Sequence, residues 1–139
     1  MTADEVWYQG DRFSGDIDYD LNFFNWNRYW IIYCDGTGHQ GYLEQPVVVN
    51  NTNVFFRGYN NTIAHFNFVF SHLPPELMDT LVVNGCSAGG LATLTWLETI
   101  GTYAKNANPN IKVIGLPDAG FFLDYTSNLT GRNDYGRNI

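Results

Sequence analysis

The chain has 139 residues, of which 45% are hydrophobic, 17% aromatic and only 15% charged, a composition typical of a folded protein with a substantial core. Its formal net charge of −7 argues against nucleic acid and anionic membrane surfaces as partners, because both require basic patches. No stretch approaches the roughly 20 apolar residues of a membrane span. We therefore expect no membrane insertion, and the sequence after Met1 lacks the charged-then-apolar pattern of a signal peptide.

Composition along the chain suggests three parts of one domain, or of a piece of one. Residues 1–27 are polar, aromatic and rich in glycine without helical or strand periodicity, so we expect an irregular N-terminal segment. Residues 28–125 form an α/β core in this interpretation. Residues 126–139 are a polar, glycine-bearing tail that we expect to be loop.

The first half of the core predicts two strands and a helix. We expect one strand at 28–34, followed by a glycine-rich loop at 35–41, and a second strand at 54–57 after a polar turn. Apolar residues then recur every three or four positions, which predicts a helix that begins at Asn60 or Asn61 and ends before Pro74-Pro75. Of the three histidines, those at 65 and 72 fall on this helix, and we interpret them as solvated or core-edge side chains.

The most informative stretch is Asn84-Gly85-Cys86-Ser87-Ala88-Gly89-Gly90. It follows an apolar run of strand length at 80–83 and precedes a helical pattern at 91–102. A Gly-x-Ser-x-Gly sequence between a strand and a helix is typical of a nucleophile elbow. Ser87 is therefore the candidate catalytic nucleophile.

The residues around Ser87 suit such a turn. A strand that reverses abruptly into a helix brings the two backbones close together, and we expect Gly85 and Gly89 to leave the required space. The start of the helix supplies free N–H groups and a partial positive charge. We expect the N–H of Ala88 to bind the oxyanion of an acyl-transfer intermediate.

A further turn at 106–110 leads into a strand at 111–116. Alternating strands and helices predict a parallel sheet, whose ligand crevice lies beyond the carboxyl ends of the strands. That rule places the loops at 35–41, 57–60 and 118–122 on one rim with the elbow. We accordingly predict substrate-pocket residues in these loops, namely Asp35, His39, Asp118 and Phe121.

A serine nucleophile also needs a base, normally a histidine held by a carboxylate. In α/β hydrolases the acid and the histidine follow the serine, but all three histidines here, at 39, 65 and 72, precede Ser87. Three explanations stay open: the chain is a piece of a longer enzyme, it is a non-catalytic relative, or His39 is the base in an unusual order.

Cysteines and sequons leave the cellular compartment open. Cys34 and Cys86 could pair with each other, pair with cysteines outside this chain, or stay as thiols. Asn-x-Ser/Thr triplets permit glycosylation of a secreted protein at Asn50, Asn60 and Asn128.

Five blocks of the sequence, in order, resemble the pectin acetylesterase and Notum carboxylesterase family. The chain is more similar to the pectin acetylesterase branch, because a cysteine precedes Ser87 and Asp-Gly follows Cys34. The blocks are Phe-Phe-Asn-Trp-Asn at 23–27, Tyr-Cys-Asp-Gly at 33–36, Phe-Phe-Arg-Gly at 55–58, Gly-Cys-Ser-Ala-Gly-Gly-Leu-Ala at 85–92, and Asp-Ala-Gly-Phe-Phe-Leu-Asp at 118–124.

The resemblance implies an α/β-hydrolase-like parallel sheet with flanking helices, a secreted or cell-wall location, and serine esterase chemistry with no metal and no cofactor. It implies that Ser87 is the nucleophile and Ala88 the oxyanion donor. The expected substrate is an acylated polysaccharide from which acetyl groups are removed. The alternatives are a protein-lipid deacylase of the Notum type, and a non-catalytic carbohydrate-binding or degenerate relative.

The chain also departs from the family pattern. The family's Gly-Gly-Trp-Cys block, which completes the oxyanion hole, should precede Asp4, and its catalytic Asp and His should follow Ile139. We therefore expect this sequence to be the central part of the domain, incomplete at both ends, and inactive by itself. A parallel sheet without its outer strands has unpaired edges, so self-association is also expected.

Overall fold

A computed structural model describes residue 18 and residues 22–122 and 125–131. The chain divides into two units, residues 1–30 and residues 31–139, which are considered separately. Most of the N-terminal segment that we expected to be irregular lies outside the described residues, as does the end of the polar tail.

Among the described residues of the first unit, residues 22–25 form a turn. The Arg28 guanidinium donates from Nη2 to the carbonyl oxygens of Phe23 and Phe24, at 2.8 and 2.9 Å. The rings of Phe23 and Trp26 meet edge to face with centroids 5.1 Å apart. These contacts close the turn on itself.

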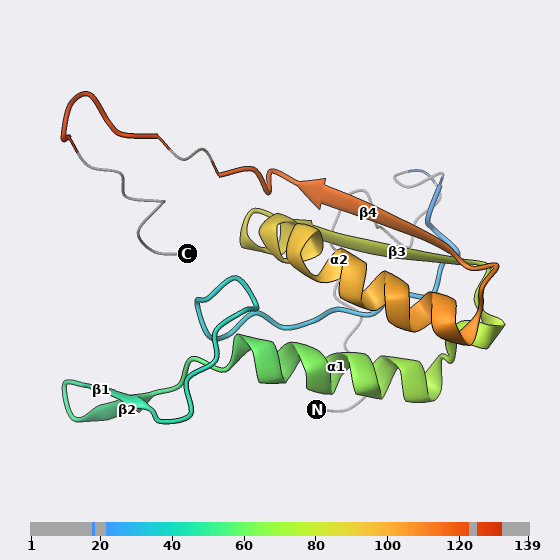
Figure 1. The fold of residues 1–139 in the computed structure, drawn as a ribbon, viewed down its shortest axis with the longest axis horizontal. Helices are drawn as coiled ribbons and strands as arrows, with labels where there is room; N and C mark the ends of the chain where they lie inside the picture. The colour runs from blue at the N-terminus through green and yellow to red at the C-terminus, as the bar shows by residue number, and fades with distance from the viewer. Residues whose placement is uncertain (1–17, 19–21, 123–124, 132–139) are drawn as a thin grey trace. The chain divides into compact units, whose positions relative to one another are not determined.

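The second unit contains two helices, a short 3-10 helix and two separate pairs of strands among its described residues (Figure 1). In chain order the elements are β1 (Val47–Val49), β2 (Thr52–Val54), α1 (Gly58–His72), the 3-10 helix η1 (Pro75–Leu77), β3 (Thr80–Cys86), α2 (Ala88–Ala107) and β4 (Lys112–Asp118).

The larger pair of strands is parallel, with a register that runs from Thr80 opposite Lys112 to Cys86 opposite Asp118. α2 connects these strands and covers one face of the pair. A Cβ built on Gly115 would lie 2.6 Å from the Leu97 side chain, so β4 has a glycine where the helix approaches most closely. The predicted α/β fold with a parallel sheet and flanking helices is confirmed.

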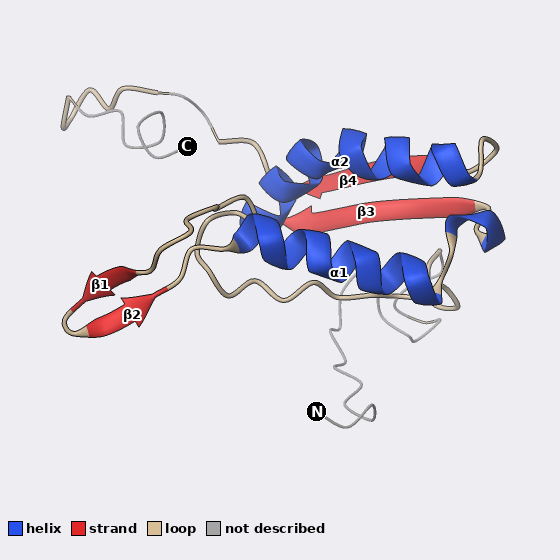
Figure 2. Cartoon of the chain, turned by 60° about the horizontal axis from the view of Figure 1, so that its bottom comes forward, coloured by secondary structure: helices blue, strands red, loops and turns tan. Residues whose placement is uncertain are grey.

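Aromatic side chains join the two helices. Phe70, Trp96 and Ile100 are buried together, and Leu81 and Val83 of β3 pack against them. The Phe66 ring of α1 contacts the Trp96 ring of α2 edge to face at 5.8 Å between centroids. Both helices run opposite to β3 (Figures 1 and 2), so their N-termini lie at the carboxyl end of that strand.

Two of the expected strands are wrong. Residues 28–34 form neither helix nor strand, and residues 55–57 lie outside β2, which ends at Val54. β2 instead pairs antiparallel with β1, across a two-residue turn in which Asn50 and Asn51 both have positive φ, of 49° and 61°. That left-handed geometry closes a hairpin and prevents the parallel pairing that we expected of this stretch.

The other elements agree with the sequence-based expectations within a few residues. α1 begins at Gly58 instead of Asn60 or Asn61, β3 extends through Cys86, and α2 begins directly after Ser87. Across the described residues, no helix is both long enough and apolar enough to cross a membrane.

Candidate active site

Ser87 lies at the sharp turn between β3 and α2. Its backbone has φ 57° and ψ −116°, a sparsely populated combination for a residue with a side chain, and Ser87 is exposed. Two hydrogen bonds hold this geometry: Ser87 N–H donates to the carbonyl of Asp118 at 2.9 Å, and Leu91 N–H donates to the carbonyl of Ser87 at 3.0 Å. The turn thus has the strained strand-to-helix form of a nucleophile elbow.

Glycines allow the backbones around the turn to approach one another. A Cβ on Gly85 would collide with the backbone of Gly89, because it would lie 2.7 Å from the Gly89 Cα. A Cβ on Gly89, in contrast, would meet nothing within 4 Å. The space requirement that we expected of both residues therefore applies at Gly85 and not at Gly89. A second close approach, which the sequence did not reveal, joins Gly90 to Gly120, where an added Cβ on either residue would lie 2.7 Å from the other's Cα.

Ala88 is the first residue of α2. N–H groups in the first turn of a helix have no acceptor within the helix and carry part of the positive end of the helix dipole. When Ser87 Oγ adds to an ester carbonyl carbon, the negative charge that develops on the carbonyl oxygen would lie beside this turn. This position suits the predicted oxyanion donor.

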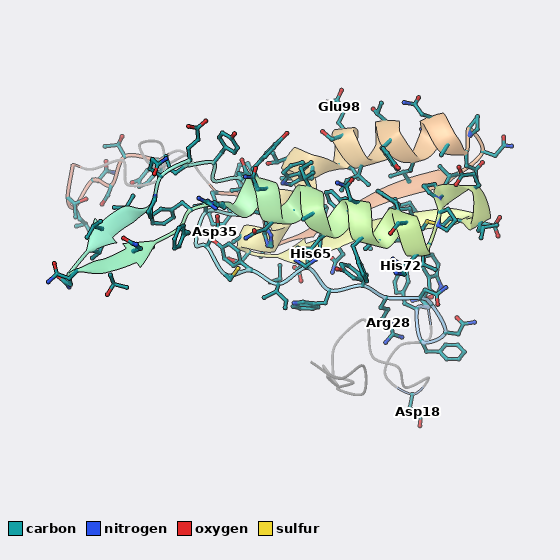
Figure 3. All side chains as sticks on the ribbon, turned by 90° about the horizontal axis from the view of Figure 1, so that it is seen from below. Asp18, Arg28, Asp35, His65, His72 and Glu98 are labelled. Atoms are coloured by element: carbon teal, nitrogen blue, oxygen red, sulfur yellow. The ribbon has the colours of Figure 1, made fainter. Side chains whose placement is uncertain are left out.

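The glycine-rich loop at 35–41 is fixed at the N-terminus of α1. The buried Asp35 carboxylate accepts hydrogen bonds from Thr37 N–H at 3.2 Å, from the Thr37 hydroxyl at 2.6 Å, and from the N–H of Gly58. Figure 3 shows Asp35 at this end of α1 and His72 at the other. Because Asp35 caps the first N–H of α1 from far along the chain, the helix starts earlier than its local sequence predicts.

His39 lies in the same loop with φ 64°. Its buried ring stacks on that of Tyr33, with centroids 4.7 Å apart. Burial lowers the pKa of His39, although the nearby Asp35 carboxylate opposes that shift. The neutral imidazole is the form that a base requires. In the part of the chain that the structure describes, however, the hydrogen bonds of Ser87 are formed by its backbone N–H and carbonyl. These bonds do not join the Ser87 hydroxyl to the His39 ring.

Comparison with known proteins identifies the family. A family model described as Pectinacetylesterase matches residues 4–136, which is nearly the whole chain. The chain belongs to the pectinacetylesterase family. The resemblance found in the sequence blocks is therefore confirmed.

Curated relatives of this chain come from Arabidopsis thaliana. It is 34% identical over 135 residues to Pectin acetylesterase 5 and 36% identical over 119 residues to Pectin acetylesterase 4. The matches cover 94% and 80% of this chain but 30% and 26% of the two relatives. The chain thus spans less than a third of the length of these relatives.

The remaining candidate residues lie in different parts of the chain. Asp118 is the last residue of β4 and is half-buried. Phe121 lies in the segment after β4, and 82% of its surface is exposed. His72 is the last residue of α1, at the end of this helix away from Asp35. Its ring contacts Phe68, and its Nδ1 lies 2.8 Å from the Phe68 carbonyl oxygen. His72 therefore lies at the amino end of β3, away from Ser87.

The two cysteines are not joined to each other, and both are exposed. Of the sequon asparagines, Asn50 lies in the hairpin turn, Asn60 in the first turn of α1 and Asn128 in a turn of the tail, and all three are exposed. No group of three or more histidine, cysteine or acidic side chains capable of holding a metal ion occurs within residues 22–122 and 125–131 or at residue 18.

Proposed function

We propose that Ser87 is the nucleophile of a serine esterase that removes acetyl groups from a pectin-like polysaccharide, and that this chain is the part of the enzyme that carries the elbow. The observation that carries the proposal is the strained backbone of an exposed serine, held by Asp118 at the carboxyl end of two parallel strands and followed directly by a helix N-terminus. The names of the relatives, pectin acetylesterases, suggest the acyl group and the polymer.

The proposed reaction has two steps. Ser87 Oγ attacks the ester carbonyl as its proton passes to a base, and the Ala88 N–H stabilises the oxyanion until the sugar hydroxyl leaves with a proton. Water then attacks the acetyl-enzyme, which releases acetate and restores the Ser87 hydroxyl. No histidine occurs among residues 88–139, so we expect the isolated 139-residue chain to lack a base in the usual order.

Charge and sequons extend the proposal. A net charge of −7 over these residues suits a heavily esterified polymer better than a strongly anionic one. Cell-wall polysaccharide lies outside the cell, so we propose a secreted protein, with exposed Asn50 in the hairpin turn available for a glycan. Among the described residues, the β3–β4 pair has no further strand on either side. We also propose that these strand edges promote self-association of the isolated chain.

The test is acetate release from acetylated pectin by the protein expressed from its complete coding sequence. We expect Ser87→Ala to lower turnover by roughly 10⁴- to 10⁶-fold, because the nucleophile is removed. Ser71→Ala is the matched control, since Ser71 is an exposed serine on α1 whose hydroxyl donates to the Phe68 carbonyl. It should leave turnover unchanged.

Other outcomes separate the alternatives. Turnover that survives Ser87→Ala would refute the assignment of the nucleophile. A wild-type protein that binds acetylated pectin without releasing acetate would favour a non-catalytic relative. Faster hydrolysis of p-nitrophenyl octanoate than of p-nitrophenyl acetate would favour a fatty-acyl esterase. The isolated 139-residue chain is expected to release no acetate.

A further inference from the structure

The Asp35 carboxylate joins both ends of the loop at 35–41. It accepts hydrogen bonds from Thr37 N–H and from the Thr37 hydroxyl, and the same hydroxyl oxygen accepts a hydrogen bond from Gly41 N–H at 2.7 Å. The tyrosine hydroxyl of residue 33 further accepts from Gly38 N–H at 2.9 Å. A short segment with positive φ at Gly36, Gly38 and His39 is thereby held in one conformation.

The same loop caps α1. Gly58 N–H donates to the Asp35 carboxylate and Tyr59 N–H donates to the carbonyl of Gly41 at 3.0 Å, so two of the four free N–H groups of this helix terminus bind the loop. The approach is so close that a Cβ on Gly58 would lie 2.6 Å from Asp35 Oδ2 and 2.7 Å from Thr37 Oγ1. The loop and the helix start therefore form one unit.

The loop is also anchored to α2, in the turn that follows Ser87. A Cβ on Gly38 would lie 3.6 Å from Leu91 Cδ2, which places the loop backbone against the Leu91 side chain. Leu91 N–H is the group that donates to the Ser87 carbonyl. Deeper in the protein, the His39 carbonyl accepts from Trp96 Nε1 of α2 at 3.1 Å and from Thr62 Oγ1 of α1 at 3.3 Å.

We propose that Asp35 is a positioning residue for ester hydrolysis: its buried carboxylate fixes the loop at 35–41 against the first turn of α2, so that the loop forms a rigid wall beside Ser87. This inference rests on the proposed function. Asp35 uses its oxygens to hold Thr37 and Gly58 and acts on the ester through the loop. A wall that shifts by about 1 Å can lower turnover up to about 100-fold, because the ester carbonyl loses its alignment with the nucleophile.

The test compares Asp35→Asn with Asp79→Asn in the protein expressed from its complete coding sequence. Asp79 is an exposed aspartate next to the start of β3, at the far end from Ser87. Active serine is first titrated with a fluorophosphonate, and acetate release from acetylated pectin is then expressed per titrated site. This normalisation removes any loss of folded protein, which a merely structural role would produce.

We expect Asp35→Asn to lower kcat/KM per titrated site by roughly ten- to a hundredfold, and Asp79→Asn to leave it unchanged. If Asp35→Asn yields no folded protein, Thr37→Val and Thr37→Ser give the same test. The valine lacks the hydroxyl that binds Asp35 and should lower kcat/KM per site, whereas the serine retains it and should restore the value.

The outcomes also distinguish this inference from the proposed function. A wild-type protein that is titrated and active, with Asp35→Asn and Thr37→Val equal to it per titrated site, would overturn the positioning role alone. A wild-type protein in which fluorophosphonate does not label Ser87 would overturn the proposed function itself.

Discussion

Alanine substitutions at the adjacent residues Gly89 and Gly90 should have opposite effects on stability. Both lie in the first turn of α2, so both variants gain the same preference of alanine over glycine in a helix. Their surroundings differ. A Cβ on Gly89 would meet nothing within 4 Å, whereas a Cβ on Gly90 would lie 2.5 Å from the Asp118 carbonyl oxygen and 2.8 Å from Gly120 N.

The magnitudes follow from these contacts. Gly89→Ala should raise the free energy of unfolding by about 0.5–1 kcal/mol. Overpacking costs about 1–3 kcal/mol, and we expect the upper end for Gly90→Ala because the opposing atoms belong to the backbone and cannot rotate away. The two variants should therefore differ by about 3 kcal/mol. Movement of Asp118 would also disturb its hydrogen bond with Ser87 N–H, so Gly90→Ala should lower esterase turnover.

Urea unfolding followed by tryptophan fluorescence measures this difference, because Trp96 of α2 is buried in the core. The protein expressed from its complete coding sequence should be used for both variants. Equal unfolding free energies for Gly89→Ala and Gly90→Ala would refute the close packing of the helix start against the end of β4. A Gly89→Ala variant that is less stable than the wild type would contradict the open space beside Gly89, because it would show that other atoms cover this side of α2.

Two further predictions concern the loop at 35–41. Trp96→Phe keeps a ring but loses the donor to the His39 carbonyl, which should cost about 1 kcal/mol in urea unfolding beyond the cost of the smaller ring in the core. Combined with Thr62→Val it should cost more than the sum of the two single changes, because the carbonyl then has neither donor. Strict additivity of the two changes would contradict the shared acceptor. Burial lowers the pKa of His39 in the folded protein below the ordinary value of 6.5. As the pH falls, the imidazole is therefore protonated in the unfolded chain before it is protonated in the folded one. The free energy of unfolding should consequently decrease as the pH drops from 6.5 through the pKa of His39 in the folded protein. His39→Asn, which tolerates the positive φ, should flatten that pH dependence of the unfolding free energy, whereas an unchanged profile would contradict a buried neutral imidazole.

The strand, turn and helix around Ser87 could be predicted from sequence because their signals are local. The apolar run at 80–83, the two elbow glycines and the helical pattern adjoin one another, and each favours its element without help from distant residues. The same holds for α1 and for β4, which begin and end within a few residues of the expected positions. The family resemblance likewise depended on short contiguous blocks.

Sequence reasoning failed where an element needs a partner. An apolar run such as that at 28–34 favours extended backbone, but a strand also requires a neighbour for its hydrogen bonds, and nothing in the run specifies one. Residues 54–57 gave the same signal, yet the left-handed Asn50-Asn51 turn assigns Val54 to a hairpin with Val47. Strand pairing is decided by the turn and by what lies alongside.

The candidate site divides in the same way. The sequence by itself determined that Ser87 occupies a glycine-flanked turn before a helix, because that chemistry lies within seven consecutive residues. Only the tertiary structure decided that Asp35 caps a helix beginning 23 residues later, and that Gly90 faces Gly120. These contacts join segments far apart in the chain, and their geometry exists only once both helices have packed at the carboxyl end of β3.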